Sequence, residues 1–346
     1  MLNQPYTNHK IMNNTRRPLQ ILLLFSLAFS LPVLTNAQIQ SNGTGGGVFT
    51  DDSTWTGDIA PAYGESWLIQ SGDNVTSASN VSISSGSSNA INGSLTLASH
   101  HINIGTGGGD LSVTGTLDAV RMYTNPSSTD SSIQLSITNG GSVSVSNRLF
   151  LDNTNTSSTR ASSVTLNGGS LINSSPSSYV GFRLYGADAD DRATFSMIGN
   201  SNTVSEFDFV DLFNTSTGYE NTATDINFKL AAGPAGAGAV TAINAINYVT
   251  LGGNAFEIDF TDVERPETGS IVYSTTLIDY GNSLNGTYGT LTSLGLGAGE
   301  SATLFNDEIN NIIGVSYTLA AIPEPSSFTV IAGFFALAVI GLRRRR

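Results

Sequence analysis

The sequence has 346 residues, of which 39% are hydrophobic, 12% are charged and 37 are glycine, a composition that suits a folded chain with a sizeable core. It contains no cysteine, which excludes disulfides, thiolate metal sites and cysteine nucleophiles. All 27 acidic residues but only seven of the 14 basic ones lie between Gln38 and Pro325, so this segment is strongly acidic. We expect it to lack the clustered cationic face that nucleic acid requires, and therefore expect no nucleic-acid partner.

The first 37 residues have the three parts of a secretory signal peptide. A lysine and two arginines precede the apolar run LQILLLFSLAFSLPVL, and small residues follow it. We therefore predict export by the general secretory route, with signal peptidase cutting between Ala37 and Gln38. The alternative, a buried core helix, is disfavoured because nothing downstream is helical enough to pack against it.

The mature chain opens with a glycine-rich stretch followed by STW and PAYGESWLIQSGDNVT. Here aromatic or aliphatic residues alternate with polar ones around turn residues, which predicts a first strand pair or a capping layer. The stretch resembles the lead-in of bacterial secreted β-solenoids, in which a Trp, a proline-containing turn and a strand begin the stack.

Residues 38–192 contain an approximate repeat, a glycine followed by Ser or Thr and then by Leu or Val. One turn and short alternating strands per unit are what one coil of a right-handed parallel β-helix requires. We therefore predict a β-solenoid that resembles autotransporter repeats, with Leu, Ile and Val pointing inward and Ser, Thr and Asn outward. The four copies are Gly93-Ser94-Leu95, Gly115-Thr116-Leu117, Gly141-Ser142-Val143 and Gly169-Ser170-Leu171.

The segment LSITNGGSVSVS supports a competing fold. Asn139-Gly140 between two alternating apolar runs is a strong signal for the tight turn of a β-hairpin, and an antiparallel β-sandwich would follow from it. We favour the solenoid because the repeat occurs four times at similar spacing.

After residue 192 the Gly-Ser repeat stops and aromatic residues become frequent, as in EFDFVDLF. We interpret residues 193–320 as a second β-rich unit that continues or caps the solenoid. The whole mature chain up to residue 320 is therefore predicted to be all-β.

Candidate chemical groups are few in the mature chain. His100 and His101 are its only histidines, and because neighbours in a strand point to opposite faces, we do not expect them to share a metal or a nucleophile. The run GADADDR brings three aspartates together, and neighbouring carboxylates with loop carbonyls suit a calcium ion. No other cofactor is expected. These aspartates are Asp188, Asp190 and Asp191.

Three further interpretations stay open. The same aspartates with Arg192 would supply the acid and base of a polysaccharide-cleaving β-helix enzyme, although a solvated loop is the simpler interpretation. A carbohydrate-binding module would present a row of exposed aromatic residues, for which the candidates are Tyr179, Phe182 and Tyr185, with a core position as the alternative for Phe182. A second, weaker acidic group for calcium has four members, the first two sharing one strand face: Glu257, Asp259, Asp262 and Glu264.

The last segment, residues 321–346, carries three features in order. A Pro-Glu-Pro motif comes first, and 17 uncharged residues, 326–342, follow it; as a helix, at about 1.5 Å per residue, they would just span a bilayer core. Four arginines come last and place this end in the cytoplasm by the positive-inside rule. The motif is Pro323, Glu324 and Pro325, and the tail is Arg343, Arg344, Arg345 and Arg346.

This order resembles the PEP-CTERM sorting signal of Gram-negative bacteria, which usually accompanies a signal peptide and a cysteine-free ectodomain rich in Gly, Ser, Thr and Asn. The resemblance implies that an exosortase recognises Pro323, Glu324 and Pro325 while the exported protein is transiently anchored in the inner membrane. It also implies a final location at the cell surface or in the extracellular matrix, in association with exopolysaccharide and biofilm. We therefore predict a non-catalytic surface or matrix protein.

Overall fold

The computed structural model describes residues 38–124, 132–152, 162–173, 181–185, 193–199, 206–212, 224–230, 233–234 and 243–321. Contacts divide the chain into Met1–Ala37 and Gln38–Arg346, and all described residues belong to the second unit. They form strands and one short 3-10 turn, η1 (Asp52–Thr54), so that no helix in this part of the chain is long and apolar enough to span a membrane. The predicted signal peptide and the predicted membrane helix lie outside the described residues.

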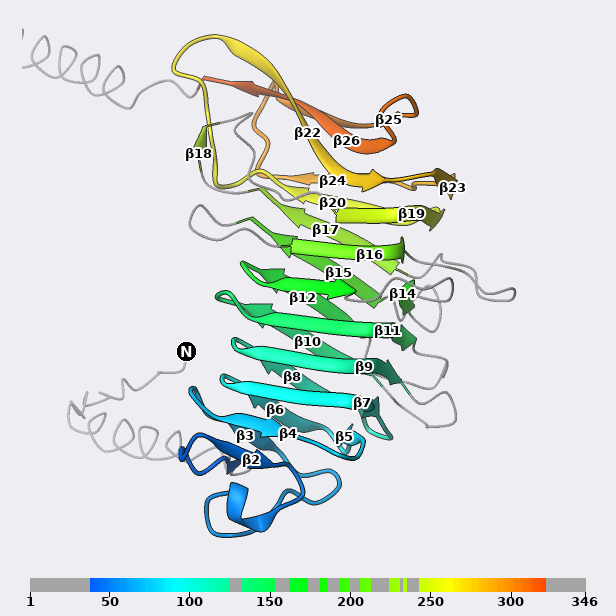
Figure 1. The fold of residues 1–346 in the computed structure, drawn as a ribbon. Coiled ribbons are helices and arrows are strands. Elements are labelled where there is room, and N and C mark those ends of the chain that lie inside the picture. Colours follow the sequence, from blue (N-terminus) through cyan, green and yellow to red (C-terminus); the bar gives the residue numbers. More distant parts are fainter. Residues whose placement is uncertain are drawn as a thin grey trace, which may run out of the picture. The chain divides into compact units, whose positions relative to one another are not determined.

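Most strands belong to two parallel sheets between which the chain alternates (Figure 1). In the first sheet the spatial order of the strands is their order in the sequence. This sheet contains β1 (Ile39–Gln40), β3 (Trp67–Ile69), β6 (Ser87–Ile91), β8 (Gly109–Val113), β10 (Ile133–Thr138), β12 (Ser163–Asn167), β15 (Ala193–Ile198), β17 (Thr224–Lys229), β20 (Ala255–Asp259) and β24 (Leu291–Leu294).

The second sheet follows the same rule up to its last strands, and three short strands pair beside its main path. We call each first-sheet strand together with the second-sheet strand that follows it a layer. The main path runs through β2 (Gly46–Val48), β4 (Asn74–Thr76), β7 (Ser94–Ile104), β9 (Thr116–Thr124), β11 (Ser142–Asp152), β13 (Ser170–Asn173), β16 (Glu206–Leu212), β19 (Ile243–Gly252), β22 (Ser270–Tyr280), β26 (Ile312–Ala320) and β25 (Ser301–Asp307); beside it lie β5 (Val81–Ile83), β14 (Gly181–Tyr185) and β23 (Ser283–Thr287), and a separate pair consists of β18 (Gly233–Pro234) and β21 (Val263–Glu264).

The predicted all-β class is confirmed, and the competing alternative, a hairpin at Asn139-Gly140, is wrong. Asn139 and Gly140 do adopt positive φ values of 54° and 84°, as the Asn-Gly signal requires. The strands on either side of this turn, β10 and β11, nevertheless lie in different sheets and pair in parallel with their neighbours. Among the described strands, only β22, β25 and β26 pair in antiparallel fashion, so the antiparallel sandwich is also wrong.

The Gly-Ser-Leu repeat marks equivalent positions on successive layers. Ser94, Thr116, Ser142 and Ser170 are paired in register across β7, β9, β11 and β13. The preceding residue must be glycine because the backbone of the neighbouring layer leaves no room for a side chain. A Cβ on Gly115 would lie 1.9 Å from the carbonyl oxygen of the repeat glycine one layer earlier.

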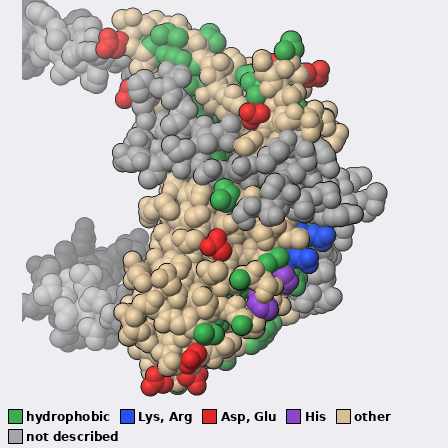
Figure 2. Space-filling model, in the orientation of Figure 1, with side chains coloured by type: hydrophobic (Ala, Val, Ile, Leu, Met, Phe, Trp, Pro, Cys, Tyr) green, Lys and Arg blue, Asp and Glu red, His purple; other side chains and the backbone are tan. Residues whose placement is uncertain are grey.

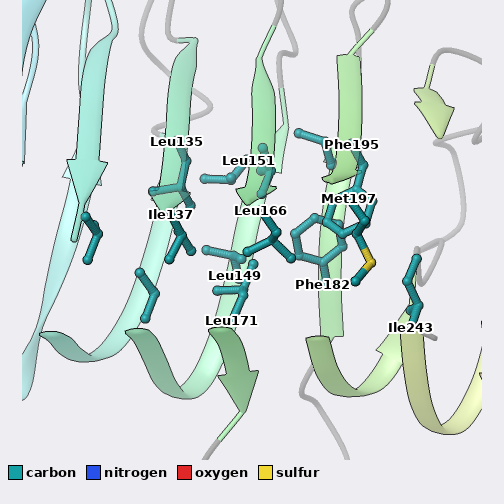
Figure 3. Packing of buried hydrophobic residues seen from close by; sticks show 14 of the residues in the cluster. Leu135, Ile137, Leu149, Leu151, Leu166, Leu171, Phe182, Phe195, Met197 and Ile243 are labelled. Atoms are coloured by element: carbon teal, nitrogen blue, oxygen red, sulfur yellow. The ribbon is translucent and has the colours of Figure 1, made fainter. Parts of the chain in front are cut away.

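The core consists of inward-pointing apolar side chains, which stack in rows from strand to strand. β10 shows the alternation that the sequence predicts, with every other residue buried. Apolar side chains from adjacent strands meet in the space between the sheets, where Phe182 and Phe195 pack edge to face with ring centroids 5.5 Å apart. Figure 3 shows part of this cluster: Leu135, Ile137, Leu149, Leu151, Leu166, Leu171, Phe182, Phe195, Met197 and Ile243.

Aromatic residues close the first end of the core, as the predicted capping layer requires. Trp55 and Trp67 are each 1% exposed, and Phe49 packs edge to face against both, at centroid distances of 5.1 and 5.5 Å. The predicted boundary between residues 192 and 193 falls between β14 and β15. Both sheets run across it, because β12 pairs with β15 and β14 pairs with β16.

Candidate functional site

Long strands of the second sheet are interrupted partway along their length. β7 pairs with β9 as far as Leu97 and again from His101, and β11 pairs with β9 as far as Val145 and again from Arg148. Irregularities of this kind bend a strand and re-aim its side chains. Beyond them, β5, β14 and the last residues of β7, β9 and β11 form a parallel ladder of their own.

Outward-pointing residues of this ladder are mainly basic or aromatic, and they lie in register on three layers. They are partly exposed, while the residues that alternate with them are buried. We call these six residues the basic–aromatic strip: His101, Arg121 and Arg148 form one row, and Asn103, Tyr123 and Phe150 form the other.

The strip is the place on this face of the molecule where cationic and histidine side chains gather (Figure 2). β14 extends the ladder by one strand, and its backbone sets Arg183 in register with Phe150. Three of the seven basic residues between Gln38 and Pro325 therefore lie on neighbouring strands of one ladder. For Arg183 this placement concerns the backbone alone.

Aromatic rings of the strip are held by their basic neighbours. The guanidinium carbon of Arg148 lies 5.4 Å from the centre of the Phe150 ring, within the range of a cation–π interaction. His101 and Tyr123 pack edge to face at 6.0 Å. The backbone N–H of His101 donates a 3.0 Å hydrogen bond to Oδ1 of Asn80, which fixes the start of the strip.

The two arginines of the strip have no carboxylate partner among the described residues. The ion pairs in this part of the chain join Lys229 to Asp262 at 2.8 Å and to Asp259 at 3.8 Å, and Arg265 to Glu300 at 3.1 Å. Burial and the positive charge of Arg121 together lower the pKa of His101 below its ordinary value. At neutral pH the strip therefore carries two guanidinium charges beside a neutral imidazole.

Several polar atoms of this region are buried without a hydrogen-bond partner. An unsatisfied buried polar atom costs about 1–3 kcal/mol, and such atoms often mark functional positions. Five of those found among the described residues belong to the strip or to the interruption before it: His101 Nδ1, Asn103 Oδ1, Arg121 Nε, Asn147 Oδ1 and Arg148 Nε.

A small hollow of about 180 Å³ lies beside the first strand of the ladder, β5. Its lining includes Phe49, Tyr63, Trp67, Asn80 and Ser82, and the Tyr63 side chain is 68% exposed. Because Ser82 is paired in register with Asn103 of the strip, hollow and strip occupy the same ladder.

Most residues singled out in the sequence lie outside the described residues. Gln38, the predicted first residue of the mature chain, is described: its side-chain amide donates a 2.9 Å hydrogen bond to the carbonyl of Ser88. The others have no described position: Ala37, Tyr179, Asp188, Asp190, Asp191, Arg192, Pro323, Glu324, Pro325, Arg343, Arg344, Arg345 and Arg346.

The second acidic group does not form a metal site. Glu257 and Asp259 share the outer face of β20, as predicted. The ammonium group of Lys229, however, pairs with Asp259 and Asp262, the carboxylates that were expected to bind calcium. Among the described residues no three acidic or histidine side chains come together to hold a metal.

Of the three candidates for a row of exposed aromatics, Phe182 is fully buried and so belongs to the core, the alternative that the sequence left open for it. The aromatic residues that do reach the surface of this ladder, Tyr123 and Phe150, were missed. The signal that identifies them is the recurrence of basic–apolar–aromatic, RMY and RLF, shortly after successive repeat glycines.

Comparison with known proteins finds no matching family, no similar curated protein and no similar solved structure. The chemistry of the candidate site therefore rests on its own residues. Two guanidinium groups on adjacent strands, without a carboxylate partner among the described residues, are able to bind carboxylate or phosphate groups in bidentate fashion, and the neighbouring rings offer apolar surface beside them.

Proposed function

We propose that residues 38–320 form a right-handed parallel β-helix that the cell exports and displays. Support comes from the strand order, in which the chain alternates between two parallel sheets and adds each new strand beside the previous one. Crossovers between parallel strands of one sheet are almost always right-handed. Such a helix presents long, regular outer faces and leaves the turns free to vary.

We further propose that the protein is a non-catalytic surface or matrix component that an exosortase processes. The observation that carries this proposal is the ordered set of Pro323-Glu324-Pro325, an apolar stretch and four arginines, in a chain that begins with a secretory signal. The end of the described β-structure agrees with it. The backbone N–H of Ala321 donates a 2.8 Å hydrogen bond to the carbonyl of Gly269, so the described β-structure reaches to within two residues of the motif.

Substitution of the motif tests this proposal. In a host that contains an exosortase, changing Pro323, Glu324 and Pro325 to alanine is expected to leave a full-length precursor in the membrane fraction. Changing Ser326 and Ser327 to alanine is the matched control and is expected to leave processing unaltered. Immunoblotting of membrane, surface and matrix fractions measures the processing. Normal trimming of the triple variant would contradict the proposal.

Carbohydrate binding is a second candidate function. The observation that favours it is the basic–aromatic strip, which places partly exposed rings and unpaired guanidinium groups on one ladder of parallel strands. Such a module and a matrix protein are compatible, because a matrix component needs a surface that holds it among polysaccharide chains. The enzyme alternative depends on Asp188, Asp190 and Asp191, which lie outside the described residues.

A further inference from the structure

We propose that the basic–aromatic strip binds the carboxylate groups of an acidic polysaccharide lying along the stack of strands, an inference that rests on the proposed association of this protein with extracellular polysaccharide. The strip thereby defines the chemical class of the ligand: a linear chain of sugars that carries a carboxylate on many of its units.

Charge complementarity is the first reason. Arg121 and Arg148 are opposite each other on adjacent strands, which lie about 4.8 Å apart in a sheet. Two like charges so close repel each other, and no carboxylate of the described residues neutralises them. Anions bound between or beside the two guanidinium groups remove this repulsion and form charge-assisted hydrogen bonds.

The second reason is that polar atoms around these charges lack partners. The Nε atoms of Arg121 and Arg148 are both buried and unbonded, so no hydrogen bond from Nε fixes either guanidinium group. Asn103 and Asn147 each bury an unbonded Oδ1 in the same region. Side chains without these hydrogen bonds can turn to meet a ligand, and binding then satisfies groups whose isolation costs the free protein stability.

The repeat of the strip is the third reason. Each layer contributes one basic or imidazole residue and one neighbour, so a polymer lying across the strands meets the same pair of positions layer after layer. Several weak contacts on one chain then act together, because each bound unit raises the local concentration of the next. A monomeric anion has no such advantage.

An acidic polysaccharide fits the strip better than nucleic acid does. Binding of single strands relies on successive bases that stack on aromatic rings, whereas the Arg148 guanidinium already lies 5.4 Å from the centre of the Phe150 ring, so the strip offers charge more than it offers a series of free ring faces. The segment from Gln38 to Pro325 as a whole, with 27 acidic and seven basic residues, also repels a densely charged phosphate backbone. A polysaccharide with spaced carboxylates meets the two guanidinium charges and is screened from the distant acidic residues by salt.

Binding of purified full-length protein to sodium polygalacturonate, with neutral dextran as the comparison, tests the inference. We expect wild-type protein to bind polygalacturonate and not dextran, with an affinity that falls as salt is added. Arg148→Gln should weaken binding about tenfold or more, because it removes a charged, bidentate donor. Arg148→Lys retains the charge but not the two parallel N–H donors of the guanidinium group, so its affinity should lie between those of wild type and Arg148→Gln.

Lys229→Gln is the matched control. It removes the same single charge from a residue of the first sheet that pairs with Asp262, and it should leave the affinity unchanged. Thermal unfolding of all variants checks that they are folded.

The pKa of His101 gives a second readout. Polygalacturonate should raise this pKa in wild-type protein, as measured by nuclear magnetic resonance, because a bound carboxylate stabilises the imidazolium form.

Equal binding by wild type and Arg148→Gln would overturn the assignment of the site. No binding to polygalacturonate, or tighter binding to single-stranded DNA, would overturn the choice of ligand. Neither outcome decides the proposed function, because processing at Pro323-Glu324-Pro325 and recovery in the matrix fraction are measured separately in cells.

Discussion

At the scale of single residues, buried polar groups fix the first layers of the fold. Asp73 is 1% exposed, yet its carboxylate accepts hydrogen bonds from the Ser41 hydroxyl and from the backbone N–H groups of Gly43 and Gly45, the latter two at 3.0 and 2.9 Å. It thus ties the glycine-rich start of the mature chain to the turn before β4. Burial raises the pKa of Asp73, but these hydrogen bonds outweigh it and hold the pKa below its ordinary value.

A consequence for stability follows from the sign of this shift. Because the pKa of Asp73 is lower in the folded than in the unfolded chain, its contribution is complete above the ordinary value of 3.8 and is lost as the pH falls through the folded-state pKa. Asp73→Asn should reduce the free energy of unfolding by about 1–3 kcal/mol at neutral pH, and the difference from wild type should shrink in acid. Urea unfolding across this pH range measures both effects.

The exposed Asp58 provides the control for this measurement. Asp58→Asn changes the same charge in the same part of the chain, at a side chain on the surface, and should alter stability by less than about 0.5 kcal/mol. A difference between Asp73→Asn and wild type that stays constant down to acid pH would mean that ionisation of Asp73 does not stabilise the fold.

At the scale of strands and turns, glycines determine how closely the layers approach. Gly115→Ala should destabilise the protein by about 1–3 kcal/mol or more, because the new Cβ would lie 1.9 Å from the carbonyl oxygen of Gly93 and one layer would have to shift. Gly297→Ala is the comparison, since its Cβ would meet nothing closer than the Glu300 carboxylate at 3.5 Å. Denaturant unfolding should separate the two variants; similar midpoints would show that the layers tolerate a methyl group.

The same elements show how far sequence alone reaches. The repeated Gly-Ser-Leu predicted which residues stack, because close approach of two backbones requires a glycine in every copy of the repeat. Asn139-Gly140 predicted the backbone angles of a turn but not the partners of the strands around it, since the same local conformation leads either back along a hairpin or on into another sheet. Local chemistry fixes the turn, and long-range packing decides the pairing.

The strip was missed for a related reason. The interruption differs in length from strand to strand. It contains three unpaired residues in β7, one in β9 and two in β11. Basic and aromatic positions are therefore out of phase with the repeat glycines and look unrelated in the sequence. Only the register of the strands brings Arg121 and Arg148 side by side. The other candidate residues were found from composition and motif, which need no register.

At the scale of the whole folded part, the two ends differ in how they close the stack. Trp55, Trp67 and Phe49 cover the first end. Toward the other end the pairing becomes antiparallel in β22, β26 and β25, and a partly buried ion pair connects Arg265, just after β21, with Glu300, just before β25. The Glu300 carboxylate also accepts a 2.9 Å hydrogen bond from the backbone N–H of Ala320, which fixes the end of β26.

Removal of the first cap should loosen the stack locally. Trp55 packs on Phe49 and donates a 2.8 Å hydrogen bond from its indole to the Phe49 carbonyl, and Trp55→Ala should lower stability by about 3–5 kcal/mol. Each layer contacts chiefly its neighbours, as in repeat proteins. Hydrogen exchange should therefore speed up most in β1 to β4 and little in β15 to β20. Uniform acceleration of exchange along the chain would indicate that the layers unfold as one unit. Tyr63→Ala, at an exposed side chain, is the control and is expected to change exchange little.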